Sequence, residues 1–100
     1  MLSADFLEDL KEVFDDVWDY IENTYGAHYG DVNKVQLIDL WESAGIANTM
    51  FKGDITKYAL RYGKKDGKNK KDLMKILHYT LLLLYLDHYA QGKDEGSRET

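Results

Sequence analysis

Residues 58–73 read YALRYGKKDGKNKKDL, and this stretch decides how the second half of the chain folds. It begins at the end of one amphipathic segment, passes through Gly63 and Gly67, and leads into a second apolar segment. Asn69 precedes that second segment as a side chain suited to an N-cap, and Asp72 falls in its first turn. Because a short connection makes two helices antiparallel neighbours, the stretch predicts a helical hairpin that turns between residues 63 and 69.

Two predicted helices flank this turn. The first runs from about residue 49 to Gly63, with an apolar stripe at helical spacing formed by Phe51, Ile55, Tyr58, Ala59 and Tyr62. The second runs from residue 70 to about residue 90, and its middle, LLLLYL at residues 81–86, is apolar on every side. Such a segment is typical of a helix buried between neighbours or at a subunit contact. We therefore expect the protein to form a homo-oligomer.

The first half of the chain predicts two further helices. Residues 4–24 have apolar side chains at helical spacing and a largely acidic opposite face, with Ser3 as N-cap and Gly26 as stop. Residues 32–44 follow, between Asp31 and Gly45. The sequence thus predicts an all-α fold, a small bundle of four helices whose third and fourth form an antiparallel hairpin. We place one domain at residues 1–91 and a disordered polar tail at residues 92–100.

The composition narrows the class of protein. One hundred residues suit a single core, and the absence of cysteine excludes disulfides and thiolate metal sites. The longest apolar run has six residues, whereas a membrane-spanning helix needs roughly 20. The N-terminal segment is acidic and amphipathic, unlike a secretory signal. We therefore expect a cytoplasmic protein with no membrane partner.

Charge is separated along the chain. Residues 1–25 hold eight carboxylates and one lysine, whereas residues 49–80 hold nine basic and three acidic side chains, within a net charge of −5. Two interpretations stay open. In the first, the acidic helix neutralises the basic segment, within one chain or between subunits, and each exposed pair contributes about 0.2 to 1 kcal/mol. In the second, the basic segment binds an anion.

The second interpretation predicts a phosphate site. The turn leads into a helix N-terminus, where free backbone N–H groups and the helix dipole favour a phosphate. The expected ligand-binding side chains are Lys57, Arg61, Lys64, Lys65 and Lys68. The turn is not a P-loop, because three residues instead of four separate its glycines and Asn69 stands where a Ser or Thr would ligate magnesium.

Metal-dependent chemistry has weaker support. Carboxylate pairs at helical spacing resemble those of the Mg²⁺-dependent all-α nucleotide pyrophosphatases, which are a further alternative. These pairs are Glu8 with Glu12, Asp15 with Asp19, and Asp39 with Glu42. The three histidines are far apart in sequence and lack the spacing of a helical zinc site, so we expect no resident metal ion.

A set of spaced motifs carries a resemblance to a known family. They are His28-Tyr29, VQLID at residues 35–39, FKGDITKYALR at residues 51–61, Lys64-Lys65 and DLMK at residues 72–75. Together, over about residues 28–86, they resemble a family of small bacteriophage proteins of unknown function. Its members carry His-Tyr, Phe-x-Gly-Asn-x-x-Lys-Tyr-x-x-Arg and Asp-Leu-x-Lys. A phage nucleotide kinase that lacks a P-loop is similar in this region.

The resemblance implies a phage-encoded protein of the infected host's cytoplasm that binds a nucleotide or another phosphate-bearing small molecule. Nucleotide-kinase-like transfer, with Mg²⁺ bound to the nucleotide, is the activity it implies. The matched polar positions are His28, Lys57, Arg61, Lys65, Asp72 and Lys75. Asp54 stands where the family has asparagine. No catalytic base can be named, so whether the protein is an enzyme stays open.

The alternative is a non-enzymatic interaction protein. A host-takeover factor of this kind would dock a host protein through its charge-separated surface, and the apolar residues 81–86 would mediate self-association. We do not expect a nucleic-acid partner, because the acidic N-terminal helix opposes one. Binding to nucleic acid would show a steep loss of affinity with salt.

Overall fold

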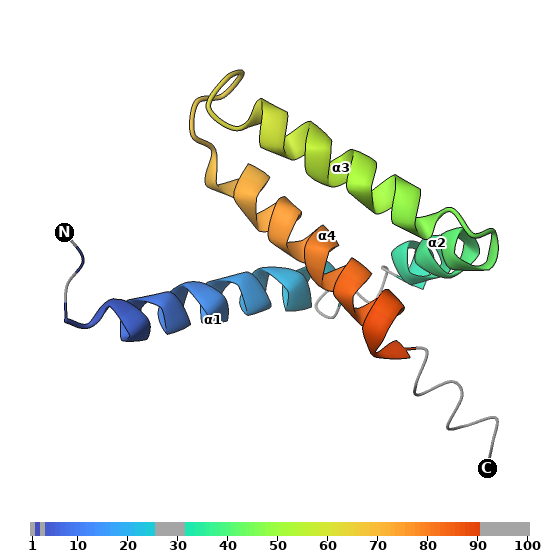
Figure 1. Cartoon of the computed structure of the whole chain (residues 1–100), viewed down its shortest axis with the longest axis horizontal. Helices are drawn as coiled ribbons and strands as arrows, with labels where there is room; N and C mark the ends of the chain where they lie inside the picture. Colours follow the sequence, from blue (N-terminus) through green and yellow to red (C-terminus); the bar gives the residue numbers. More distant parts are fainter. Residues whose placement is uncertain (1, 3, 26–31, 91–100) are drawn as a thin grey trace, which may run out of the picture. The chain divides into compact units, whose positions relative to one another are not determined.

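The computed structural model describes residues 2, 4–25 and 32–90, apart from the side chains of residues 32–36. Within them the chain is all-α (Figure 1). Its helices are α1 (Phe6–Tyr25), α2 (Val32–Ser43), α3 (Ala47–Arg61) and α4 (Lys70–His88). The predicted all-α fold with four helices is confirmed, and each described helix end lies within two residues of its expected position.

The chain divides into two compact units, residues 1–40 and residues 41–100. The first unit holds α1 and most of α2, and the second holds the last turn of α2 together with α3 and α4. The single domain expected at residues 1–91 stays a prediction. The tail expected at residues 92–100 lies outside the described residues.

Helix α1 forms because apolar residues recur at helical spacing between carboxylates. Glu8 and Asp9 lie in its first turn, where the positive end of the helix dipole favours negative charge. Val17 and Ile21 are buried, one turn apart, whereas Trp18 is 56% exposed. The caps expected at Ser3 and Gly26 lie outside the described residues.

Helices α3 and α4 pack against each other as an antiparallel pair joined by residues 62–69, which confirms the predicted hairpin (Figure 1). Aromatic rings of α3 and α4, with Trp41 of α2 at one end, form a row that we call the aromatic row. Trp41 meets Phe51 edge to face with centroids 5.7 Å apart, Phe51 stacks on Tyr79 at 5.8 Å, and Tyr79 stacks on Tyr58 at 6.2 Å. Phe51 is only 1% exposed, so this row is the centre of the hairpin core.

The turn is closed by backbone hydrogen bonds that two glycines permit. Gly63 and Gly67 have φ of 85° and 68°, a region that other residues enter at a cost, and the Gly63 N–H donates to the Gly67 carbonyl over 2.8 Å. Asn69 then caps α4, because its side-chain oxygen accepts from the Lys71 N–H at 2.9 Å. The predicted N-cap is therefore confirmed.

The apolar segment at residues 81–86 lies in the second half of α4. Leu84 and Tyr85 are 46% and 47% exposed, and the other four side chains are half-buried. Despite this run, none of the helices in the described parts of the chain is long and apolar enough to cross a membrane.

Candidate functional site

The predicted basic residues gather at the end of the hairpin that carries the turn. Lys57 and Arg61 lie on the last turns of α3, and Lys75 lies on the second turn of α4. Lys64, Lys65 and Lys68 are exposed on the turn itself. His28, which the family motif adds to the set, lies outside the described residues.

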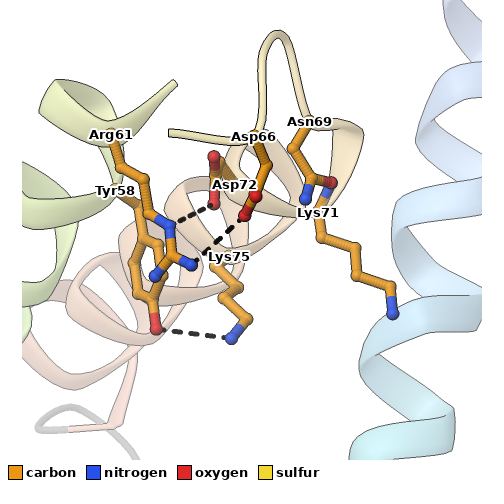
Figure 2. Close-up of polar contacts among 7 residues, drawn as sticks. All are labelled: Tyr58, Arg61, Asp66, Asn69, Lys71, Asp72 and Lys75. Carbon is orange, nitrogen blue, oxygen red and sulfur yellow. Dashed lines mark hydrogen bonds and ion pairs between the residues drawn. The ribbon is translucent and has the colours of Figure 1, made fainter. Parts of the chain in front are cut away.

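Lys57 and Lys75 converge on the ring of Tyr58, although they belong to different helices. Their ammonium nitrogens lie 4.6 Å and 4.8 Å from the ring centroid, within the range of cation–π attraction. Lys75 Nζ also donates a hydrogen bond of 3.3 Å to Tyr58 Oη (Figure 2). We call Lys57, Tyr58 and Lys75 the tyrosine–lysine cluster.

The two lysines change the acidity of the Tyr58 hydroxyl. Burial of the residue raises the pKa of this hydroxyl, but the hydrogen bond from Lys75 and the positive charges of Lys75 and Lys57 outweigh burial. The net effect is a pKa below the usual 10.0 of tyrosine. The cluster therefore favours negative charge at this point of the surface.

Arg61 is turned toward carboxylates of its own hairpin. Its Nη2 lies 3.5 Å from Asp66 Oδ2 in the turn, and its Nε lies 4.0 Å from Asp72 Oδ1 on α4 (Figure 2). Asp72 is 5% exposed, which is rare for a carboxylate unless it is paired. The positive charge of Arg61 is thus shared between two acidic neighbours.

This pairing is incomplete. Arg61 Nε and Asp72 Oδ2 are both buried, and neither has a hydrogen-bond partner among the residues that the structure describes. A buried polar atom without a partner costs about 1 to 3 kcal/mol, and a charged one costs more. The Arg61–Asp72 pair therefore leaves one buried donor and one buried acceptor unsatisfied.

The other basic side chains differ in how far they are neutralised. Lys57 Nζ lies 3.8 Å from Asp54 Oδ1, but the lysine side chain is 58% exposed, so this pair is weak. Among the described residues, Lys64, Lys65, Lys68 and Lys75 form no ion pair.

The N-terminus of α4 is partly occupied by the chain's own groups. Asn69 Oδ1 already accepts from the Lys71 N–H, and the buried Asp72 carboxylate lies in the first turn. The neutral Asn69 amide satisfies one backbone donor, and the Asp72 carboxylate supplies negative charge, where the sequence predicts a bound phosphate. Among the described residues at this end of the hairpin, the basic side chains without an ion pair are Lys75 of the cluster, the three lysines of the turn, and Lys70 and Lys71 at the start of α4.

Sequence reasoning leaves Tyr58 out of the candidate site, because it falls on the apolar stripe of α3. The ring does belong to the core, at 9% exposure, while the hydroxyl meets Lys75. The signal in the sequence is the adjacency of Lys57 and Tyr58 within the motif FKGDITKYALR.

No cation site accompanies these groups in the part of the chain that the structure describes. Over those residues, no group of three or more His, Asp or Glu side chains is placed to hold a metal ion. His78 is 5% exposed and stacks on Tyr79, with centroids 5.6 Å apart, so it is a packing residue of the hairpin.

Comparison with known proteins matches the chain to a family. A family model described as a protein of unknown function (DUF3310) matches residues 21–80, which is more than half of the chain. The matched span contains the turn, the tyrosine–lysine cluster and the Arg61–Asp72 pair. No curated protein and no solved structure matches the chain.

Proposed function

The chain belongs to the DUF3310 family, and we propose that it binds a nucleotide or another phosphate-bearing small molecule through the basic side chains of the α3–α4 hairpin. The observation that carries this proposal is the convergence of Lys57 and Lys75 on one aromatic ring. Because the two ammonium nitrogens lie 4.6 Å and 4.8 Å from the same ring centroid, their positive charges are close to each other. An anion between or beside them would offset their mutual repulsion.

The exposed turn adds to this attraction. Lys64, Lys65 and Lys68 lie between α3 and α4 without an ion pair in the described structure. Charges act over a screening length of about 8 Å at physiological salt, so these lysines raise the local concentration of anions and speed their arrival. The turn thus recruits the ligand, and the tyrosine–lysine cluster holds it.

Phosphoryl transfer is the activity to which this proposal extends. The resemblance to a phage nucleotide kinase without a P-loop supports it, as does the chemistry, which depends largely on positioning and charge neutralisation. Magnesium bound to the nucleotide would supply further neutralisation. On this proposal the protein acts in the cytoplasm of a phage-infected bacterium.

Isothermal titration calorimetry tests the binding function. The wild-type protein is titrated with nucleoside mono-, di- and triphosphates, with and without Mg²⁺. We expect micromolar binding of at least one nucleotide and a loss of about tenfold or more in Lys57→Ala and Lys75→Ala, since charged hydrogen bonds contribute roughly 1.5 to 3 kcal/mol. Lys52→Ala, which removes an exposed lysine elsewhere on α3, is the matched control.

Two results contradict the proposal. One is the absence of binding by every nucleotide in the panel. The other is an equal loss of nucleotide affinity in Lys52→Ala and in Lys57→Ala, because it would show that only the net charge of the protein affects binding.

A second candidate function is protein interaction, and exposed apolar side chains favour it. On the second unit they include Leu60, Leu73, Leu77, Leu84 and Tyr89. The partner we propose is a second copy of the chain, with a host protein as the alternative. Light scattering after size exclusion would show a concentration-dependent mass that Leu84→Glu lowers. A monomer at every concentration would contradict self-association.

A further inference from the structure

Tyr58 combines a fixed ring with a free hydroxyl proton. The ring stacks on Tyr79 at an interplanar angle of 19° and is 9% exposed, so the aromatic row holds it in place. The hydroxyl accepts a hydrogen bond from Lys75 at 3.3 Å. Rigid placement of a polar atom is what a binding group needs, because little entropy is lost when a ligand arrives.

The direction of the Lys75 hydrogen bond determines whether the Tyr58 hydroxyl can still donate a hydrogen bond. An ammonium group has donors and no acceptor, so Tyr58 Oη must accept from Lys75 and keeps its own O–H as a donor. Within the described residues, no acceptor takes that proton. The two lysines lower the pKa of the Tyr58 hydroxyl, and a lower pKa makes its O–H a stronger hydrogen-bond donor.

The surroundings of this donor select an anionic acceptor. Lys57 approaches from α3 and Lys75 from α4, and Lys57 also lies 3.8 Å from the Asp54 carboxylate. Two positive charges beside one O–H donor complement an oxygen that carries negative charge. With a neutral hydroxyl or amide ligand, Lys75 would have no opposite charge among the described residues, and Lys57 would have only its weak pair with Asp54.

We propose that Tyr58 Oη donates a hydrogen bond directly to a phosphate oxygen of the ligand, between the Lys57 and Lys75 ammonium groups. This role rests on the proposed phosphate-binding function. It makes Tyr58 a binding residue in addition to a core residue. It also links the ligand to the aromatic row, because the ring that carries the hydroxyl is the last ring of that row.

Tyr58→Phe is the sharpest test, because it removes the hydroxyl and keeps the ring in the stack. The nucleotide that binds best in the panel is titrated into Tyr58→Phe, and Tyr62→Phe, at the C-cap of α3, serves as control. We expect Tyr58→Phe to bind about tenfold more weakly and Tyr62→Phe to bind like the wild type. Thermal unfolding of both variants checks that the hairpin is intact.

A second readout follows the hydroxyl itself. In wild-type protein with ¹³C-labelled tyrosine, the ring carbon bonded to Oη reports the pKa of Tyr58, and Tyr58→Phe identifies its signal. Saturating inorganic phosphate should raise this pKa, because an anion beside the hydroxyl opposes ionisation and competes for Lys75. A purely structural Tyr58 would show no such response.

The outcomes separate the two proposals. The Tyr58 role is overturned if Tyr58→Phe binds the nucleotide with the same affinity as the wild-type protein, or if phosphate does not change the pKa of Tyr58. In both cases the binding function stands. If no nucleotide binds to wild-type protein, the binding function itself is overturned, and the Tyr58 role with it.

Discussion

Arg61 Nε lies 4.0 Å from Asp72 Oδ1, across the two helices of the hairpin, and forms no hydrogen bond with any described residue. Asp72 is buried, whereas the Arg61 side chain is 39% exposed and also faces Asp66. The pair therefore joins an internal carboxylate to a cation that reaches the surface. The guanidinium of Arg61 thus contributes to the stability of the hairpin and is also the group that a ligand could reach.

Asp72→Asn should lower the free energy of unfolding by about 2 kcal/mol, because it leaves the buried Arg61 Nε without its opposite charge. Asp66→Asn is the matched control. The Asp66 side chain is 52% exposed, and its loss should cost less than about 1 kcal/mol. Urea unfolding of both variants measures the difference. Equal effects would show that burial of Asp72 has no energetic consequence.

Asp66→Asn should increase the affinity for a nucleotide severalfold. Asp66 lies 3.5 Å from Arg61 Nη2, so it competes with a phosphate for the exposed side of the guanidinium. Asp87→Asn makes the same change in net charge near the other end of α4, where Asp87 accepts hydrogen bonds from Asn48 at 3.1 and 2.9 Å. Calorimetry of the two variants compares them. A stronger gain in Asp87→Asn would refute local competition.

The Tyr58 hydroxyl should make stability rise with pH below pH 10. Its pKa is lowered in the folded state, whereas in the unfolded chain it is about 10. Between these two values the unfolded state binds more protons, so the free energy of unfolding increases with pH. Chemical unfolding of wild type and Tyr58→Phe from pH 7 to pH 10 measures the effect. The difference between the two proteins should grow toward pH 10, and a difference that shrinks would contradict the sign.

Glycine substitutions in α3 and in the turn should have opposite effects. Gly53 lies in the interior of α3 with no positive φ, and an added Cβ would meet no atom within 4 Å. Gly53→Ala should therefore stabilise the protein by about 0.5 to 1 kcal/mol. Gly63 has φ of 85°, so Gly63→Ala should cost about 1 kcal/mol through backbone strain alone. Thermal and urea unfolding give both values, and a stabilising Gly63→Ala would contradict the positive φ.

The helices, the N-cap and the turn of the hairpin can be predicted from the sequence. Helical spacing of Phe51 and Tyr58 gives the buried side of α3, and Asn69 marks the start of α4 through a side chain that accepts from the backbone. These features depend on residues within one or two turns of each other. For that reason the turn and the pairing of α3 with α4 follow from residues 58–73.

The partners of the charged side chains cannot be predicted from the sequence in the same way. The sequence predicts that Lys57 and Arg61 bind the same ligand, yet Arg61 faces Asp66 and Asp72 while Lys57 lies at Tyr58. Asp66 lies in the turn that the Gly63–Gly67 hydrogen bond closes, and there it comes within 3.5 Å of Arg61 Nη2. Such a contact depends on the three-dimensional path of the loop, which spacing along a helix does not encode.

The aromatic row also gives the protein an internal optical reporter. Trp41 lies at one end and Tyr58 at the other, so excitation of Tyr58 can pass to Trp41 through rings separated by 5.7 to 6.2 Å. Ionisation of Tyr58 changes its absorption and therefore its ability to act as an energy donor. In a Trp18→Phe background, the fluorescence of Trp41 becomes a label-free record of the charge state at the far end of the hairpin.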